Sequence, residues 1–325
     1  MTATTSEAAP DTAPLRSLGP DYVARWEARG SVRTRPRKTI DFGLTGHFFP
    51  ADRQPLLLAP EVAGLDGEVR ERILIQSFFK YLHDIVNLEI KEIVSACTKV
   101  LDGTLPVPLS DELKLNCYSI VIDEYYHVYI AQDLILQLRK RYPDLGHFDF
   151  PVSDSMRAVA EIKARLDARY HDVFEVLANC IFETTLVREL VEFFNAEDVH
   201  PSIRYYVNDH MNDESRHYAF FLDLMKHVWA ELPEDYREAI GSRLGEFVKL
   251  YLTVESEKQF NVALMTEVLG GDAARAEASV ARLYEGFDVT ADLPIAQNVL
   301  RAFGKAGLLD HAAVRSSFRK IGWEV

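Results

Sequence analysis

The octapeptide 210–217 carries two histidines and a glutamate at spacings that suit a metal site. An α-helix turns by about 100° per residue, so His210 and His217 fall about 40° and about 60° from Glu214, on the same side. Two imidazoles and a carboxylate on one narrow face are good ligands for a first-row transition metal. The alternative interpretation is an ordinary solvated polar face. Further ligands elsewhere in the chain decide between the two.

Glu124 and His127 repeat this chemistry in an earlier helical stretch. Their spacing places them about 60° apart on one face, and that face is apolar. A charged glutamate is costly to bury there unless a cation meets it. The neighbours at helical spacing are Ile120, Val121, Val128 and Ala131. A further pair with this spacing, Glu197 and His200, precedes Pro201 in a turn, and we interpret it as incidental.

Two single glutamates complete the pattern. Glu89 lies on the apolar stripe of the helical stretch 67–102, whereas Glu92 lies beside it, so Glu89 is preferred. Further on, Glu183 is preferred to Glu175, because each half of the chain then pairs one glutamate with a later Glu-x-x-His motif across one turn. This order is that of carboxylate-bridged di-iron and di-manganese four-helix bundles.

Charge balance favours such a centre. Four carboxylates balance two divalent ions, so a neutral centre can be buried without a large desolvation penalty. We therefore expect two iron ions, with manganese as a substitute. An oxygen-rich set of bridging ligands suits these metals better than zinc, whose structural sites are closed and tetrahedral.

The elements that must position these residues are predicted to be helices, because apolar residues recur every three or four positions and no stretch alternates as a strand does. The long helices are expected at 67–102, 109–142, 153–195 with a break left open, 201–231 and 233–269, and shorter ones at 272–286, 293–306 and 310–320. The predicted fold class is all-α, a ferritin-like four-helix bundle with additional C-terminal helices. Residues 1–20 are expected to form a mobile tail and 21–325 a single domain.

Composition limits the partners. The chain has 36 basic and 50 acidic side chains, a net charge of −14, which argues against nucleic acid or an anionic membrane as partner. No apolar run suits a membrane span or a signal peptide, so a cytoplasmic location is expected. The basic segment 33–38 is interpreted as solvated surface, the alternative being a site that attracts an acidic redox partner. A short amphipathic piece is expected at 22–27. The cysteines are interpreted as reduced packing residues: Cys97, Cys117 and Cys180.

The residues singled out above resemble those of the AurF-like non-heme di-iron arylamine N-oxygenases, over roughly residues 20 to 310. In that family a histidine one turn before the last Glu-x-x-His motif also binds iron, and His210 stands at that position. Residues 21–325 would then be a di-iron oxygenase domain. Matched residue by residue, the resemblance implies a complete set of metal ligands: Glu89, Glu124, His127, Glu183, His210, Glu214 and His217.

The resemblance also implies the reaction. A diferrous centre would bind O2, form a peroxo-diferric species and oxidise an aromatic amine to the hydroxylamine and on towards the nitroso or nitro compound. Because the sequence has no Gly-rich phosphate loop, we expect electrons from an external donor, a ferredoxin or a flavin reductase. We also expect a homodimer.

Other activities of ferritin-like bundles stay as alternatives. A different di-metal oxidase, either a hydroxylase or a desaturase, would use the same carboxylates, and so would a non-enzymatic metal-storage bundle. The radical-bearing subunit of ribonucleotide reductase would need a tyrosine one turn after the first Glu-x-x-His motif, where this chain has Ala131.

The substrate pocket is expected beside the metal centre, with aromatic walls at Phe78, Tyr81 and Phe182. His83 and Asp84 would suit a neutral or cationic substrate if they face this pocket. The alternative is that both face solvent.

Overall fold

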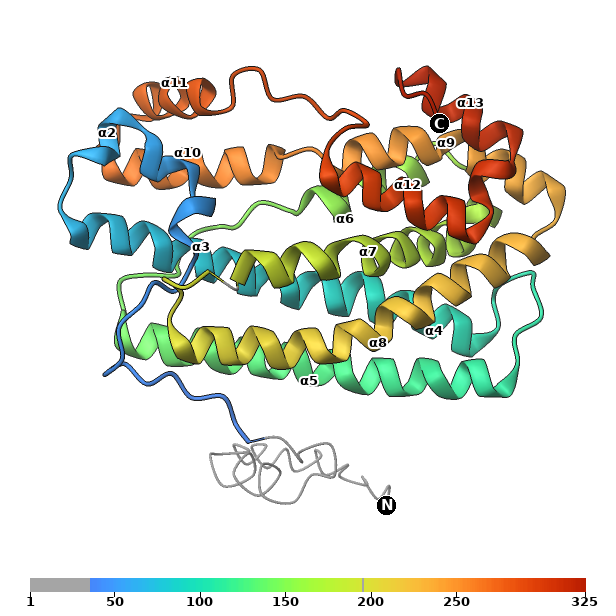
Figure 1. Cartoon of the computed structure of the whole chain (residues 1–325), viewed down its shortest axis with the longest axis horizontal. Coiled ribbons are helices and arrows are strands. Elements are labelled where there is room, and N and C mark those ends of the chain that lie inside the picture. Colours follow the sequence, from blue (N-terminus) through green and yellow to red (C-terminus); the bar gives the residue numbers. More distant parts are fainter. Residues whose placement is uncertain (1–35, 195) are drawn as a thin grey trace, which may run out of the picture. The chain divides into compact units, whose positions relative to one another are not determined.

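Four long helical segments run side by side and form a bundle (Figure 1). The computed structural model describes residues 36–194 and 196–325, and the predictions for 1–20 and 22–27 lie outside them. The segments are α3 (Gly67–Leu88), continued through a π-helical turn η3 (Glu89–Ile93) into α4 (Val94–Asp102), then α5 (Asp111–Arg141), α7 (His171–Phe194) and α8 (Pro201–Glu231). The predicted all-α, ferritin-like fold class is confirmed.

The helix ends follow capping signals in the sequence. The side chain of Ser110 accepts a hydrogen bond from the Leu113 N–H at the start of α5. At the start of α8, the His200 side chain accepts from the Ser202 N–H, and Pro201 occupies the first turn. α4 ends at Gly103, whose φ of 69° is left-handed. These signals explain why the predicted ends lie close to the observed ones.

The predicted helix 153–195 has the break that the sequence left open. It consists of α6 (Asp154–Lys163), a 3₁₀ turn η4 (Ala168–Tyr170) and α7. α6 packs against α9 (Glu234–Tyr251) as well as against α7. The first part of this stretch therefore belongs to a layer of helices outside the bundle.

The predicted helix 233–269 is wrong, because two helices stand in its place. They are α9 (Glu234–Tyr251) and α10 (Glu255–Val268). Asp154 explains the break: its carboxylate accepts hydrogen bonds from the N–H and the hydroxyl of Ser256, at 3.0 and 2.9 Å, and so caps the start of α10. This capping residue is far from α10 in the sequence, so local patterns did not reveal it.

An outer layer of helices covers one side of the bundle (Figure 1). α10 contacts α3, and α12 (Pro294–Ala306) contacts both α7 and α8. The remaining elements are η1 (Ala51–Arg53), η2 (Pro55–Leu58), α2 (Pro60–Ala63), α11 (Ala273–Leu283), α12 (Pro294–Ala306), η5 (Leu308–Asp310) and α13 (Ala312–Lys320).

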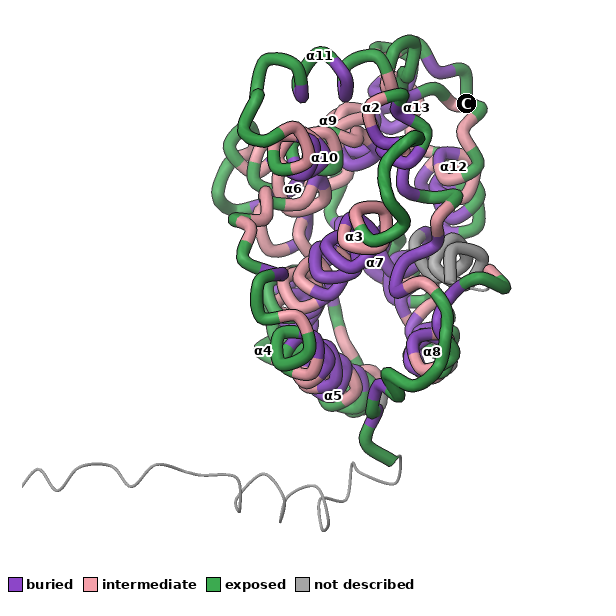
Figure 2. The backbone as a smooth tube through the Cα atoms, turned by 90° about the vertical axis from the view of Figure 1, so that its left-hand side faces the viewer, coloured by how far each residue is buried: buried purple, intermediate pink, exposed green. Residues whose placement is uncertain are grey.

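Two hydrophobic clusters fill the interior, with a polar layer between them. One gathers apolar side chains of α3, the second half of α5 and the first half of α8. The other gathers those of α4, the first half of α5, α7 and the second half of α8. Figure 2 shows that the long helices turn their buried sides inward. Polar residues at the middle of each long segment are therefore enclosed between two apolar clusters.

Lys38 departs from the prediction that the basic segment 33–38 is solvated, whereas Pro36 and Arg37 are exposed as predicted. The side chain of Lys38 is 2% exposed, and Nζ lies 2.9 Å from Oδ2 of Asp209. Gln137 of α5 fixes the same stretch of backbone, because Nε2 donates to the Lys38 carbonyl and Oε1 accepts from the Ile40 N–H. The ion pair joins residues far apart in the sequence, so composition alone did not show it. Residues 33–35 lie outside the described part.

Candidate metal centre

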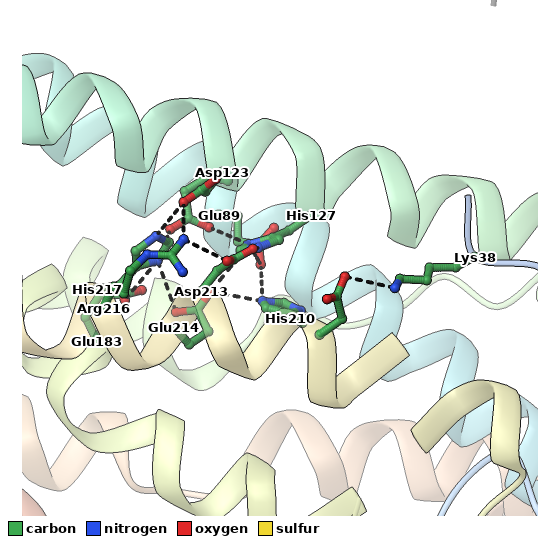
Figure 3. Close-up of polar contacts among 12 residues, drawn as sticks. Lys38, Glu89, Asp123, His127, Glu183, His210, Asp213, Glu214, Arg216 and His217 are labelled. Atoms are coloured by element: carbon green, nitrogen blue, oxygen red, sulfur yellow. Dashed lines mark hydrogen bonds and ion pairs between the residues drawn. The ribbon is translucent and has the colours of Figure 1, made fainter. Parts of the chain in front are cut away.

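Buried side chains from four helical segments meet in the polar layer (Figure 3). Each is at most 6% exposed. Their oxygen and nitrogen atoms form two groups, and within each group the atoms lie within 4.8 Å of one another. One group is Glu89, His127, His210 and Glu214, and the other is Glu124, Glu183, Glu214 and His217. The structure thus brings together every residue of the ligand set implied by the resemblance.

Glu89 enters the centre from the π-helical turn η3. A π-turn inserts an extra residue into a helix and is frequent at functional sites. Glu92 lies in the same turn but is only partly buried and belongs to neither group. Burial raises the pKa of Glu92 to about 7, although Lys163 and Lys99 act in the opposite direction. The geometry therefore separates these two glutamates in the way that the apolar stripe predicted.

Glu124 and Glu214 each face two imidazoles from the two groups. Glu124 places Oε2 3.3 Å from Nδ1 of His127, and Oε1 3.0 Å from Nδ1 of His217. Glu214 places Oε1 3.4 Å from Nδ1 of His127, and Oε2 3.3 Å from Nδ1 of His217. Carboxylates that span two positions in this way suit a pair of metal ions.

His210 makes the two positions unequal. Its Nε2 lies 3.1 Å from Oε1 of Glu89 and 3.0 Å from Oε1 of Glu214. Its ring also stacks on that of His127, with the centroids 4.0 Å apart. One group therefore contains two imidazoles and the other contains one.

The chemistry of these residues fits a pair of metal ions. Oε2 of Glu89 and Oε2 of Glu183 are buried and have no hydrogen-bond partner among the described residues. Each unsatisfied buried polar atom costs on the order of 1–3 kcal/mol, and more when it is charged. Bound cations would remove this cost. A mixed set of carboxylates and imidazoles is also what iron and manganese prefer.

The pKa values of the buried glutamates also indicate that the site needs positive charge. Burial raises the pKa of Glu89 to about 7, although His210 acts in the opposite direction. Burial, together with the charges of neighbouring carboxylates, raises the pKa of Glu183 well above its ordinary value. Burial would raise the pKa of Glu214 as well, but hydrogen bonds from His210 and His217 lower it. Without cations, protons must balance part of the buried charge.

Two aspartates lie beside the outer nitrogens of two imidazoles in a crossed arrangement, one at hydrogen-bond distance and one beyond it. Nε2 of His127 on α5 lies 3.1 Å from Asp213 of α8, and Nε2 of His217 on α8 lies 3.6 Å from Asp123 of α5. Arg216 joins both aspartates, at 2.7 and 3.0 Å. A carboxylate on the outer nitrogen keeps the proton there and leaves the inner nitrogen free for a metal.

These aspartates and the arginine were not predicted. The available signal was that an aspartate directly precedes the glutamate of each Glu-x-x-His motif. Helical spacing turns a residue in that position about 100° away from the glutamate. The same spacing leaves it about 40° from the histidine of the motif, at the edge of the ligand-bearing face, and its partner is identified only once the neighbouring helix is placed.

The glutamates and histidines that the sequence analysis set aside as ligands lie outside the metal centre. Glu175 is paired with Lys99, whose Nζ lies 2.6 Å from Oε2, and also with Lys163. His200 caps α8 and stacks on Phe48, with the ring centroids 5.2 Å apart. The three cysteines are free and buried, which agrees with their interpretation as packing residues.

Tyr81 lines a recess of about 250 Å³ between α3 and α10. Burial raises the pKa of Tyr81, and the negative charges of Glu89 and Glu214 add to this effect. The phenol is therefore close enough to the centre to experience its charge. Phe78 stacks on Tyr81 and is fully buried. Phe182 is also fully buried, and packs against aromatic side chains of α9.

Charged side chains also line this recess. Asp84 is paired with Lys80 one turn earlier, and its side chain is 35% exposed. His83 instead packs against the ring of Phe150, with the centroids 4.9 Å apart. The remaining charged lining residues are Arg53, Asp154 and Glu257. His83 and Asp84 were both considered for contact with the substrate, and of the two it is Asp84 that lines the recess.

A second cavity of about 620 Å³ lies along α5 and α8 and reaches His217. Asp123 and Arg216 form part of its wall. This groove meets the centre from the side of Asp123 and His217. The Tyr81 recess lies against α3 and α10, and its lining residues belong to neither ligand group.

The sequence matches the model of a known protein family. The family model described as p-aminobenzoate N-oxygenase AurF matches residues 34–283. This match is shorter at both ends than the resemblance suggested, but it contains every residue of both ligand groups. No curated protein matches the chain. Among the described helices, none is both long and apolar enough to cross a membrane. Since the family match covers most of its length, the chain belongs to the AurF family of N-oxygenases.

Proposed function

We propose that this protein is an O2-dependent N-oxygenase that converts an aromatic amine to the hydroxylamine, and on to the nitroso or nitro compound, at a pair of iron ions. The observation that carries the proposal is the pair of ligand groups that share Glu214, with Glu124 facing both His127 and His217, in a chain of the AurF family. One ion would be held on the His210 side and the other on the Glu183 side. Manganese is the alternative metal.

The metal pair, when bound, would supply the redox chemistry that activates O2. The contribution of the protein is to ligate, to orient and to exclude water. Asp213 holds the proton on the outer nitrogen of His127 through a hydrogen bond, and the negative charge of Asp123, 3.6 Å from the outer nitrogen of His217, favours a proton there. Both rings would then keep their inner nitrogens available. Burial of the whole ligand set keeps bulk water away from the reacting oxygen.

The stoichiometry calls for an external reductant. One amine and one O2, with two electrons and two protons, give one hydroxylamine and one water. The electrons must come from a separate donor, for which we propose a ferredoxin or a flavin reductase. The cytoplasmic location and the homodimer expected from the sequence belong to the same proposal.

We propose that the amine enters through the Tyr81 recess. Its volume of about 250 Å³ suits a single substituted ring. Aromatic walls are provided by Phe49, Tyr81 and Phe260. The carboxylates of the lining outnumber its two basic groups, Arg53 and Lys80. This balance favours a neutral or cationic arylamine over a free aminobenzoate.

Anaerobic loading with Fe(II), followed by reduction and exposure to ¹⁸O₂ with a panel of arylamines, tests the function. We expect two iron ions per chain and ¹⁸O in the hydroxylamine, nitroso or nitro product. His210→Ala should keep the fold but lose most turnover, whereas Glu92→Gln, from the same π-turn as Glu89, should retain it. Iron uptake with no oxidation of any arylamine would instead support a storage bundle or a different oxidase.

A further inference from the structure

The α10 side of the Tyr81 recess contains a buried acceptor that lacks a donor. Asn261 lines the recess, and its side chain is fully buried. Nδ2 of Asn261 donates to the hydroxyl of Tyr284, at 2.8 Å, whereas Oδ1 has no hydrogen-bond partner among the described residues. The other residues that line the recess have no such buried, unsatisfied atom in the described part of the chain. Buried polar atoms are nearly always paired, so this oxygen indicates a missing donor.

The hydrogen bonds around Asn261 fix the direction in which its amide points. Tyr284 donates its hydroxyl proton to Oε1 of Glu257, at 2.6 Å. Because a hydroxyl group has one proton, the phenol oxygen can only accept from Asn261, and only the NH2 end of the amide can donate. The carbonyl end of the amide therefore points away from Tyr284. Its donor must come from a group that is not part of this chain of hydrogen bonds.

Glu257 adds a negative charge beside this acceptor. It lies one turn before Asn261 on α10, so the two side chains share one face of the helix. Both line the recess, and Glu257 is exposed whereas Asn261 is buried. The other carboxylates of the lining, Asp84 and Asp154, each have a basic partner on their own helix. Two acceptors on α10, one of them charged, thus face a ligand from the same side.

We propose that the arylamine substrate carries a second, aliphatic ammonium group, which binds to Oδ1 of Asn261 and to the carboxylate of Glu257. An ammonium group is a compact cation with three N–H donors, so it can meet both acceptors at once. A hydroxyl group offers one proton and no charge, and a carboxylate would be repelled by Glu257. The ring of the substrate would lie along Tyr81 and Phe260, which line the same recess. This inference rests on the proposed oxygenase function and names the class of its substrate.

Calorimetric titration of the iron-loaded, full-length protein in the absence of O2 measures binding apart from turnover. Three probes share the aniline ring and differ in the group at the other end: 4-(2-aminoethyl)aniline, its isostere 4-propylaniline, and 4-(2-hydroxyethyl)aniline. At neutral pH only the first carries a positive charge. We expect it to bind ~10-fold more tightly than either of the other two. This advantage should shrink as the salt concentration rises, because Glu257 is exposed.

Two substitutions should remove the advantage of the ammonium probe. Asn261→Leu is close in size and lacks Oδ1, and Glu257→Gln removes the charge at an exposed position, where the fold tolerates it. In each variant the ammonium probe should bind ~10-fold more weakly, whereas 4-propylaniline should bind at least as tightly as to the parent. Glu255→Gln is the matched control, because Glu255 is an exposed carboxylate of α10 that does not line the recess. It should bind all three probes like the parent.

Several outcomes would overturn this proposal. Equal affinities for the ammonium and propyl probes would do so, and so would an ammonium advantage that survives in Glu257→Gln. If the hydroxyl probe bound as tightly as the ammonium probe, the missing donor would be neutral and the cationic class would be wrong. Failure of the oxygenase function looks different: the protein would bind the ammonium probe selectively, as the inference requires, yet incorporate no ¹⁸O into any probe.

Discussion

Nε2 of His127 on α5 lies 3.1 Å from Oδ2 of Asp213 on α8, and both side chains are 1% exposed. The reciprocal contact between His217 and Asp123 is longer, at 3.6 Å, and Asp123 is 30% exposed. A buried, charge-assisted hydrogen bond is stronger than a solvated one. The two imidazoles are therefore held with unequal firmness, although the two Glu-x-x-His motifs look alike in the sequence.

Asp213→Asn should lower the affinity for iron by about 10- to 100-fold, and more than Asp123→Asn does. The amide can no longer hold the proton on the outer nitrogen of His127 as a carboxylate does. Competition with a coloured chelator measures the change. Asp223→Asn, an exposed carboxylate of the same helix, should bind iron like the parent. A greater loss in Asp123→Asn than in Asp213→Asn would contradict the ranking.

Glu214→Ala should abolish binding of both metal ions, because Glu214 belongs to both ligand groups. Glu183 belongs to one group, so Glu183→Ala should retain about one ion per chain. Elemental analysis after dialysis against dilute iron distinguishes these results. Glu175→Ala, which removes a glutamate of the same helix as Glu183, should keep both ions. Two ions retained by Glu214→Ala would refute the shared position.

The ligand-bearing face of each long helix could be predicted because burial and helical spacing are local properties. Glu89 stood out from Glu92 since only Glu89 continues an apolar stripe, and the structure encloses it. Pro201 and Ser110 fixed helix starts for equally local reasons. The order of the glutamates along the chain then predicted a four-helix bundle in which these glutamate side chains meet.

What could not be predicted depends on contacts between distant parts of the chain. Asp154 ends the predicted helix 233–269 early because it caps α10 from another helix. Lys38 is buried because it meets Asp209. Asp213 meets His127 only because α5 lies beside α8. In each case a polar residue finds its partner only after the backbone has folded, so its local pattern is misleading.

Glu92 should make the metal-free protein less stable as the pH rises. Its ordinary pKa is 4.5, and burial raises it to about 7 in the folded state against the opposing charges of Lys163 and Lys99. The folded protein thus binds the proton more tightly than the unfolded chain. The penalty grows as the pH rises from about 4.5 to about 7, and is fully present above that, on the order of 1–3 kcal/mol.

The variant Glu92→Gln should therefore unfold at a higher urea concentration than the parent at pH 8, and at the same concentration at pH 4. Comparison of the two proteins at each pH cancels the effects of other titrating groups. A difference in midpoint that does not change with pH would show that packing, and not the charge, separates the variant from the parent.

Asp84→Asn should shift the substrate preference towards anionic arylamines. Asp84 is paired with Lys80 in the Tyr81 recess, so loss of its charge leaves Lys80 available for a substrate carboxylate. We expect kcat/KM for a free aminobenzoate, relative to a neutral aniline, to rise about 10-fold, a change of about 1.4 kcal/mol in relative transition-state binding. Asp102→Asn, at an exposed carboxylate outside the recess, should leave this ratio unchanged. An unaltered ratio in Asp84→Asn would move the amine to another entrance, with the groove beside His217 as the next candidate.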